Sequence, residues 1–397
     1  MIAACDGGVE KWEPTPDDGG GEVNPPVVKT VWHERASQTY NSICALYEQK
    51  SGAAAGLFSE NYPKGSGDGV ASFLWPYDGM VSGFAAMNRL GYDVKYTDRV
   101  ERFQAYYRES AVKNVGGYGS STNGTTGGGD RFYDDNSIIG IELVEAYNQT
   151  KDKKYLDRCA QIVRFLKGGY DATMGNALWW CESNINQKGN DSSNKPACAN
   201  GYATWFLMSY YEVCPDSEKA DVLTFAKSLY SWLYSNLRDP EDNTYWNSKG
   251  ADGVINKTKW TYNSGAMIAA GVRLYKATGD KSYLTQAQAT ALGSYNYFVR
   301  SRNGLALAYP TNDPWFTIQL IKAYIELEPH YTNCKSYIET FISFADYAWE
   351  HGRSSNGLFH EDWTGKTVNA DRDKQLLMQA AALESLATIA LYKGEHK

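Results

Sequence analysis

The chain has 397 residues, of which 43% are hydrophobic, so it can bury a sizeable core as one large domain or two ordinary ones. The net charge of −7 argues against nucleic acid and against an anionic membrane surface as partners. No apolar run is long enough to span a membrane. Only five His occur, none at a metal-ligand spacing from another, which argues against a His-rich metal site and leaves carboxylate ligation of Ca²⁺ open. We expect no cofactor.

The first residues resemble the end of a bacterial lipoprotein signal. Small residues precede Cys5, as in signals whose Cys becomes lipidated, although a chance Cys near a start Met is the alternative. Residues 6–26 are rich in Gly, Pro, Asp and Glu and cannot bury much surface, which predicts a flexible tether. We therefore expect residues 1–29 to anchor a single domain, residues 30–397, in the bacterial cell envelope, at the outer surface or in the periplasm. A lipid on Cys5 would be its one membrane contact.

The pattern from residue 30 onward predicts about twelve helices with few long strands between them. They cover residues 30–50, 78–89, 95–113, 134–150, 153–167, 200–213, 217–237, 262–278, 281–300, 314–328, 332–351 and 374–393. The even members carry Gly, Ala and Ser with few charges, whereas the odd members carry Lys, Glu and Asp on one face. A helix without a polar face is buried on most sides. Six alternations of inner and outer helices therefore predict an all-α fold, an (α/α)6 barrel. Two unrelated helices or an open superhelix are the alternatives.

The connections between the predicted helices repeat as well. Residues 147–156 and 275–284 share Tyr, Thr, Asp, Tyr and Leu at the same spacing, each in a short turn from an even helix into an odd one. Long, aromatic, Gly-rich loops lead from odd helices into even ones. We therefore expect the long loops on one face, at the N-terminal ends of the inner helices, where functional residues of a rigid scaffold are usually found.

Two adjacent carboxylates, Asp134 and Asp135, begin the fourth predicted helix. One Asp at a helix start is a favoured cap, because its side chain accepts orphan backbone N–H groups, but a cap needs only one carboxylate. Two carboxyl groups about 5 Å apart are what retaining glycoside hydrolysis needs, one as nucleophile and one as acid/base. The pair by itself leaves both interpretations open.

Asp or Asn begins every predicted inner helix, and Tyr or Trp accompanies most of them. Each one, taken alone, is best explained as a cap. Together they would ring a cleft with acceptors, amides and aromatic plates, which suits a neutral polyhydroxylated ligand. The candidate substrate-binding residues, with aromatic residues of the long loops included, are Asp78, Tyr133, Asn136, Trp179, Trp180, Asn200, Tyr245, Trp246, Tyr262, Asn263, Asp313 and Trp363.

The region from about residue 30 to residue 393 resembles glycoside hydrolase family 76, the endo-α-1,6-mannanases. The likeness is carried by the motifs at residues 133–136, 262–265, 274–280 and 379–384. The resemblance implies an (α/α)6 barrel, a retaining mechanism through a covalent glycosyl-enzyme intermediate, and an unbranched α-1,6-linked mannan as substrate. It also implies that Asp134 is the nucleophile and Asp135 the acid/base. Many relatives have Trp shortly after the pair, where this chain has Ile138.

Two close carboxylates do not both ionise easily, so the pair is expected to titrate as a unit and to give a bell-shaped pH profile on the acid side of neutral. The rival functions are a non-catalytic glycan-binding surface lipoprotein, a transglycosylase on the same scaffold, and a polysaccharide lyase. The two carboxylates disfavour a pure binder and the few His disfavour a lyase, whereas transfer needs the same two residues as hydrolysis. Open long loops favour endo action, and we expect a monomer.

Further predictions concern four Cys residues and Arg131. Cys181 and Cys198 flank a polar loop and could form a disulfide outside the cytosol. Cys159 and Cys214 lie in apolar helical pattern, which predicts buried thiols. Arg131 is expected to be a surface salt-bridge partner rather than a residue that tunes the pair.

Overall fold

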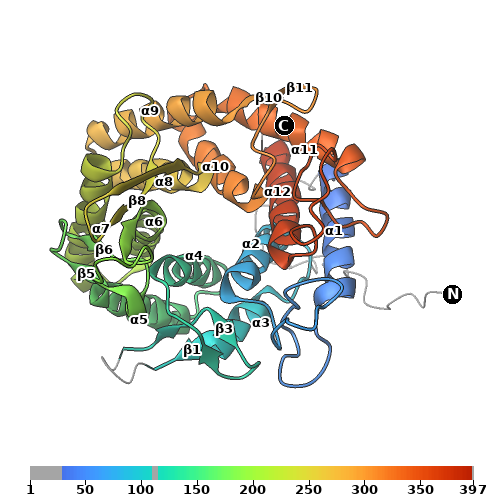
Figure 1. Ribbon diagram of the computed structural model, residues 1–397, viewed down its shortest axis with the longest axis horizontal. Helices are drawn as coiled ribbons and strands as arrows, with labels where there is room; N and C mark the ends of the chain where they lie inside the picture. Colours follow the sequence, from blue (N-terminus) through green and yellow to red (C-terminus); the bar gives the residue numbers. More distant parts are fainter. Residues whose placement is uncertain (1–28, 110–114, 396–397) are drawn as a thin grey trace, which may run out of the picture.

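The computed structural model describes residues 29–109 and 115–395, which contain twelve α-helices in two concentric rings (Figure 1). The inner ring consists of α2 (Leu74–Arg89), α4 (Tyr133–Thr150), α6 (Ala197–Val213), α8 (Thr261–Thr278), α10 (Pro314–Leu327) and α12 (Leu376–Glu395). The outer ring consists of α1 (Val31–Tyr47), α3 (Tyr96–Glu101), α5 (Lys153–Gly168), α7 (Asp216–Asn236), α9 (Lys281–Phe298) and α11 (Cys334–His351). Each inner helix packs against the next, and α12 packs against α2. The ring is therefore closed, and the predicted (α/α)6 barrel is confirmed.

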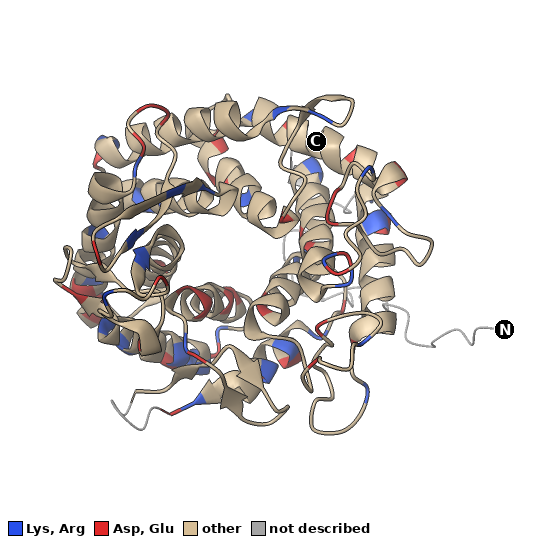
Figure 2. Ribbon diagram, viewed as in Figure 1, with Lys and Arg blue, Asp and Glu red and all other residues tan. Residues whose placement is uncertain are grey.

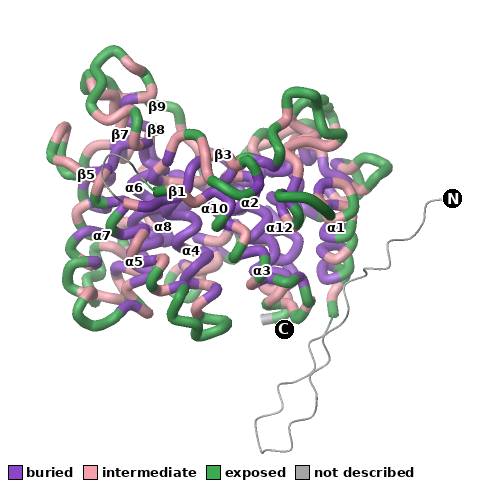
Figure 3. The backbone as a smooth tube through the Cα atoms, turned by 90° about the horizontal axis from the view of Figure 1, so that it is seen from below, coloured by how far each residue is buried: buried purple, intermediate pink, exposed green. Residues whose placement is uncertain are grey.

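Small residues let the inner helices approach one another closely. A Cβ atom on Gly265 of α8 would lie 2.9 Å from the carbonyl oxygen of Gln319 in α10. A Cβ atom on Gly83 of α2 would lie 3.1 Å from the Leu383 side chain of α12. Protein interiors are packed too densely to absorb such contacts without a shift. The backbone of the inner ring is buried along most of its length, and the exposed segments lie on the outer ring and the loops (Figure 3).

The two repeated turns have the same hydrogen bonds. Asp152 begins α5 and accepts a hydrogen bond from the Lys154 backbone N–H at 3.0 Å, while Asp280 begins α9 and accepts one from the Ser282 N–H at 2.9 Å. The preceding inner helix ends in left-handed backbone in both cases, at Lys151 with φ 57° and at Gly279 with φ 73°. The repeat seen in the sequence is therefore a repeat of helix hairpins.

The third predicted helix, over residues 95–113, is wrong in length. The α-helix α3 ends at Glu101 and continues as a 3₁₀ turn, η1 (Arg102–Tyr106), and a short strand, β1 (Tyr107–Arg108). Loop donors capture the carbonyl groups that a longer helix would use. The Thr122 hydroxyl donates to the Ala105 carbonyl at 2.6 Å, and the Gly119 N–H donates to the Tyr106 carbonyl at 2.9 Å.

Short antiparallel strands and two further 3₁₀ turns occupy the connections. They are β2 (Gly117–Tyr118), β3 (Ser121–Thr122), β4 (Gly127–Gly128), β5 (Tyr170–Asp171), β6 (Ala177–Leu178), η2 (Glu182–Asn184), β7 (Asn194–Pro196), β8 (Trp246–Gly250), β9 (Ile255–Lys259), β10 (Arg300–Arg302), β11 (Leu305–Ala308) and η3 (Glu328–His330). The longest sheet, β7–β8–β9, rises from one end of the barrel (Figure 3). Except for η3, which follows α10, these elements lie in connections from outer to inner helices, at the N-terminal ends of the inner ring.

No helix in the described ranges is long and apolar enough to cross a membrane. The predicted lipid-modified Cys5 and the predicted tether, up to residue 28, lie outside the described residues.

Candidate active site

A cavity of about 630 Å³ opens at the N-terminal ends of the inner helices. The second residue of each inner helix lines it, namely Trp75, Asp134, Cys198, Tyr262, Trp315 and Leu377. The position recurs because the six helices enter the barrel in the same orientation, and successive side chains point about 100° apart around a helix axis. The connecting segments contribute further lining residues, including Glu60, Phe73, Ser120, Phe132, Trp180, Asn194, Asn247, Arg372 and Gln375.

Asp134 accepts three hydrogen bonds at the start of α4. Its Oδ2 accepts from Trp180 Nε1 at 3.2 Å and from Cys198 Sγ at 3.0 Å, and its Oδ1 accepts from the Asp135 backbone N–H at 3.1 Å. Burial raises the pKa of Asp134, and these donors oppose the rise because they stabilise the charged form. The geometry favours an oriented, ionised carboxylate.

Asp135 lines the same cavity in a different environment. Within the described part of the chain, no donor forms a hydrogen bond with its carboxyl group. Burial raises the pKa of Asp135 well above the ordinary value, and the negative charge of Asp134 raises it further. The two carboxyl groups therefore lie in unequal environments, and the pKa of Asp135 is raised further than that of Asp134.

Aromatic rings line the cavity in two groups. The Phe316 ring lies between two nearly parallel partners, Trp75 at 5.7 Å and Tyr262 at 4.1 Å. Phe132 and Trp180 form a second pair with a centroid distance of 5.1 Å, next to Asp134. Such flat, amphipathic rings suit the apolar faces of sugars.

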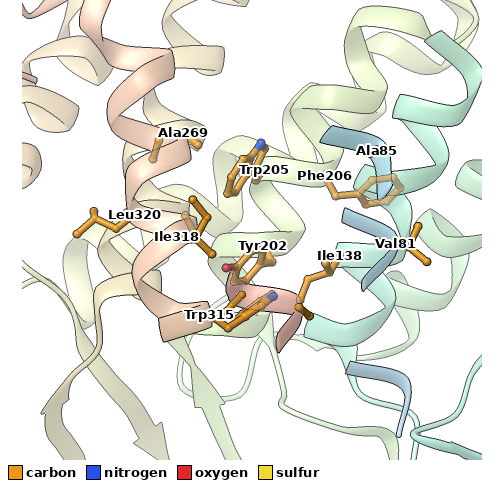
Figure 4. Packing of buried hydrophobic residues seen from close by; sticks show 14 of the residues in the cluster. Val81, Ala85, Ile138, Tyr202, Trp205, Phe206, Ala269, Trp315, Ile318 and Leu320 are labelled. Atoms are coloured by element: carbon orange, nitrogen blue, oxygen red, sulfur yellow. The ribbon is translucent and has the colours of Figure 1, made fainter. Parts of the chain in front are cut away.

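The inner end of the cavity is apolar. Ile138, Tyr202 and Trp315 come from three different helices, α4, α6 and α10, and point toward one another (Figure 4). Ile138, two positions after Asn136, therefore lies in the wall of the cavity.

Asn136 connects the start of α4 to the preceding loop. Its Oδ1 accepts from the Tyr118 N–H at 2.8 Å, and its Nδ2 donates to the Tyr118 carbonyl at 2.9 Å and to the Phe132 carbonyl at 2.7 Å. The side chain is fully buried and its hydrogen bonds go to backbone groups. The structure thus places this predicted substrate-binding residue behind the cavity wall, where it fixes a loop.

Other inner helices use the same device. Asn200 of α6 accepts from the Leu178 N–H at 2.7 Å and donates to the Leu178 carbonyl at 3.0 Å. Gln379 of α12 does the same for Phe359, at 2.8 and 2.9 Å. Each amide satisfies both backbone groups of one loop residue, so these side chains tie the long loops to the barrel.

Four predicted site residues line the cavity, namely Asp134, Asp135, Trp180 and Tyr262. The other predicted substrate-binding residues lie outside its lining: Asp78, Tyr133, Asn136, Trp179, Asn200, Tyr245, Trp246, Asn263, Asp313 and Trp363.

The aromatic residues that lie outside the cavity lining pack against other residues of the protein. Tyr133 stacks on Phe165 at 4.9 Å and fills the space over Gly169, whose Cβ position would lie 2.1 Å from the Tyr133 ring. Trp179 is fully buried and donates to Asp171 at 2.8 Å. Trp246 donates to Asp239 at 3.1 Å. Tyr245 is also buried, and Trp363 packs among three Phe rings: Phe341, Phe344 and Phe359.

The polar members have structural partners or lie deeper. Asp313 begins α10 in left-handed backbone with φ 49° and forms an ion pair with Arg372, which itself lines the cavity. Arg372 also pairs with Glu361 at 3.0 Å, so its charge is already balanced. Asn263 is fully buried, and neither polar atom of its side chain has a hydrogen-bond partner among the described residues.

Asp78 belongs to a buried cluster of carboxyl groups in the barrel interior. It is 2% exposed, and neither of its carboxyl oxygens has a hydrogen-bond partner in residues 29–109 and 115–395. Burial raises its pKa well above the ordinary value, with further contributions from Glu142, Asp135 and Glu384, against the opposing charge of Lys322. These surroundings favour the neutral form of Asp78.

Glu384 is the member of this cluster with the most hydrogen-bond donors around it. It accepts from Ser82 at 2.6 Å, from Lys322 at 2.7 Å and from Gln319 at 3.1 Å. Burial raises the pKa of Glu142 to about 7, opposed by Lys322. No group of three or more His, Cys, Asp or Glu side chains in the described ranges is arranged to hold a metal ion.

Two expectations about single residues were wrong. Cys181 and Cys198 are free thiols, because Cys198 points at Asp134 whereas Cys181 accepts from Asn184 at 3.2 Å. Arg131 is buried rather than exposed, and its guanidinium forms two hydrogen bonds with Glu182, at 2.8 and 2.6 Å. Arg131 is an ion-pair partner, and it anchors the loop beneath Asp134 and Asp135.

The prediction of buried thiols at Cys159 and Cys214 is confirmed, since both are at most 5% exposed.

Trp75, Cys198 and Trp315 line the cavity and were missed. A signal was available, because each is the second residue of an inner helix, as Asp134 is. For Trp75 and Cys198 the signal was hidden by the predicted helix boundaries, since α2 begins at Leu74 rather than Asp78 and α6 at Ala197 rather than Asn200. The start of α10 was predicted at residue 314, where it lies, so Trp315 was missed for another reason.

The sequence model of glycosyl hydrolase family 76 matches residues 31–395. The chain belongs to glycosyl hydrolase family 76. Membership makes it a glycoside hydrolase, and the cavity that holds Asp134 and Asp135 is its candidate active site. The comparison with curated protein sequences gave no match.

Solved structures of family 76 are similar along nearly the whole chain. The mannosidase Bt3792 from Bacteroides thetaiotaomicron VPI-5482 is 25% identical with a TM-score of 0.80, over 93% of this chain and 100% of that one. An inactive variant of the α-1,6-mannanase GH76A from Salegentibacter sp. HEL1_6, in complex with α-1,6-mannotriose, is 22% identical with a TM-score of 0.70, over 91% and 99%. Dfg5 from Chaetomium thermophilum in complex with glucosamine is 13% identical with a TM-score of 0.69, over 91% and 90%.

Proposed function

We propose that this family 76 hydrolase cleaves α-1,6-mannosidic bonds inside a mannan backbone, with retention of configuration and through a covalent glycosyl-enzyme intermediate. The observation that carries the proposal is the unequal environment of two adjacent carboxyl groups in one cavity. Asp134 accepts three hydrogen bonds and Asp135 none, so one member suits the nucleophile and the other the proton donor.

The similar Salegentibacter mannanase supports this assignment. Its inactive variant carries Asn in place of two aspartates with consecutive numbers, and its ligand is an α-1,6-linked trisaccharide. This chain has the same kind of pair at the start of an inner helix of the same barrel.

In the first step, an oxygen of the Asp134 carboxylate attacks the anomeric carbon while Asp135 gives its proton to the glycosidic oxygen. The bond between the anomeric carbon and that oxygen breaks, and the leaving chain departs as an alcohol. In the second step, the Asp135 carboxylate takes a proton from water, whose oxygen attacks the anomeric carbon and releases Asp134. Trp180 and Cys198 keep Asp134 oriented through both steps.

The aromatic lining supplies the sugar-binding surface. We assign Trp180 and Tyr262 to substrate binding, as predicted, and add Trp75, Trp315 and Phe316 from the cavity lining. Phe73 lies among the lining residues and is 57% exposed, which supports a cavity that admits the middle of a long chain and hence endo action.

Location and assembly are also part of the proposal. A lipid on Cys5 would hold the enzyme in the bacterial cell envelope, as a monomer, with α-mannan polysaccharide or oligosaccharide as its partner. The net charge of −7 is consistent with a mannan backbone, which is neutral.

Product chromatography after incubation with debranched α-1,6-mannan tests the proposal. We expect a mixture of short oligosaccharides. Products longer than an oligosaccharide substrate would indicate a transglycosylase, and bound but uncleaved mannan would indicate a glycan-binding protein. An unsaturated sugar at the new chain end would indicate a lyase.

A further inference from the structure

A second, smaller pocket of about 220 Å³ adjoins the active-site cavity. Phe316 lines both. The centroid of its ring lies 5.5 Å from that of Trp260, which lines the second pocket. Cations line it, namely Lys259 at the end of β9 and both arginines of β10, Arg300 and Arg302. Figure 2 shows basic residues on β10, on a chain that carries a net charge of −7.

The cations of this pocket are not equally balanced. Lys259 is neutralised, because it forms ion pairs with Asp239 at 2.7 Å and with Asp242 at 2.6 Å. In the described part of the chain, neither Arg300 nor Arg302 forms an ion pair with a carboxylate. The pocket therefore carries two positive charges that the protein does not neutralise.

The two guanidinium groups also have unused donors. Arg300 donates to the Tyr297 carbonyl and Arg302 donates to the Phe298 carbonyl at 3.0 Å, each through one nitrogen. The Nε of Arg302 is buried and has no acceptor within the part of the chain that the structure describes. Burial lowers the pKa of Arg302, and the neighbouring Arg300 lowers it further, as expected for two like charges held close together. An anion between them would relieve both the repulsion and the unpaired donor.

The walls of the pocket hold the cations in place. The Tyr297 ring contacts Lys259 at 4.5 Å and Arg300 at 5.7 Å from its centroid. The lining also includes Thr261 and Asn312, whose hydroxyl and amide groups are neutral hydrogen-bond donors. The planar guanidinium fork matches the oxygens of a phosphate or sulfate in two-point contacts.

We propose that this pocket binds a phosphate or sulfate ester carried by the glycan that occupies the active-site cavity. The inference rests on the proposed function, because a neutral chain in the cavity would place its substituents beside Phe316. The pocket adds a preference for glycans with an anionic ester near the cleaved bond and leaves hydrolysis of neutral mannan unchanged.

Binding calorimetry with mannooligosaccharides tests the proposal without requiring turnover. The probes are α-1,6-mannooligosaccharides phosphorylated at random positions and the same sample after phosphatase treatment. The intact protein should bind the phosphorylated sample about three- to tenfold more tightly, the range expected for solvent-accessible ion pairs. The double variant Arg300→Gln/Arg302→Gln should lose this preference and still bind the neutral sample as before.

Two further variants test whether the preference depends on Arg300 and Arg302 or on positive charge in general. Arg164→Gln removes one positive charge from an exposed position on α5 and should keep the preference. Arg300→Gln alters an exposed side chain, so it should lose part of the preference with an unchanged melting temperature even if the double variant is destabilised.

Equal binding of both samples by the intact protein, or a preference that survives in the double variant, would overturn the proposal. Inorganic phosphate that binds as tightly as the phosphorylated glycan would also overturn it, because the pocket would then be a free-ion site. Failure of the neutral sample to bind at all would instead count against the proposed mannanase function.

Discussion

The starts of α4 and α6 are built alike and differ in chemistry. Asn136 and Asn200 occupy the fourth position of their helices and tie down a loop residue through the same hydrogen bonds. The second positions, Asp134 and Cys198, face the cavity and contact each other at 3.0 Å. The third positions differ, with Asp135 in α4 and a buried Ala in α6.

The barrel supplies the orientation of the site, whereas single side chains supply its chemistry. The repeated helix start provides the orientation, since it presents the second residue to the cavity and anchors the loop through the fourth. Catalysis needs a second carboxyl group at the third position as well, which α4 has. In this account α6 supports the nucleophile of α4 through the Cys198 thiol.

Removal of either carboxylate should have the largest effect. We expect Asp134→Asn and Asp135→Asn each to lower kcat/KM on α-1,6-mannan by about three decades or more, since each group carries several kcal/mol of the barrier. Asp191→Asn, in an exposed loop position, is the matched control and should retain full activity. A residual rate within about tenfold of the wild type would contradict the assignment of that residue.

The pH dependence of kcat/KM should report the proton that Asp134 and Asp135 share. The active form has Asp134 ionised and Asp135 protonated, so activity falls at low pH as Asp134 gains a proton and at higher pH as Asp135 loses one. Because burial and Asp134 raise the pKa of Asp135, the basic limb should lie above the ordinary range of carboxyl groups. A profile of kcat/KM that stays flat from about pH 4 to pH 9 would contradict a titrating pair.

The side chains of Asn136 and Asn200 should contribute to the free energy of unfolding to a similar extent. Asn136→Ala and Asn200→Ala each leave buried backbone groups without partners, which should cost about 1–3 kcal/mol of the free energy of unfolding. Urea unfolding measures that cost. The activity loss should be larger for Asn136→Ala, because this residue holds the segment that leads into the catalytic pair. A larger activity loss for Asn200→Ala would contradict the division of roles between α4 and α6.

The Cys198 thiol should have the smallest effect. Cys198→Ala removes one hydrogen bond to Asp134 and should lower kcat/KM about two- to tenfold. The donor stabilises the ionised form, so its loss should move the acid limb of the pH profile upward. Cys198→Ser keeps a donor and should restore the limb. If Ser and Ala behave alike, the thiol acts through packing rather than through Asp134.

The helical alternation was sufficient to predict the barrel, because the inner and outer helices differ in composition along their whole length. The site was harder to predict because it depends on single positions. Trp179 and Trp180 are adjacent, yet one lies fully buried against Lys195 and the other lines the cavity. Successive side chains in extended backbone point to opposite sides, so which Trp faces the cavity depends on a loop register that the composition does not reveal.

The amide residues were misassigned for a related physical reason. A buried Asn beside a cavity and an Asn that binds sugar look the same in a sequence, since both need donors and acceptors. The structure shows that Asn136 and Asn200 use their capacity on backbone groups. Asp134 and Asp135 were recognisable as site candidates because two adjacent carboxylates exceed what a helix cap needs, and both line the cavity.

The stereochemistry of the first product tests the central claim most directly. Proton NMR in the first minutes after enzyme is added to α-1,6-mannan distinguishes the anomers of the new reducing ends before mutarotation mixes them. The account predicts that the α-anomer appears first and the β-anomer follows by mutarotation. A β-anomer that appears first would contradict the covalent intermediate and the role of Asp134 as nucleophile.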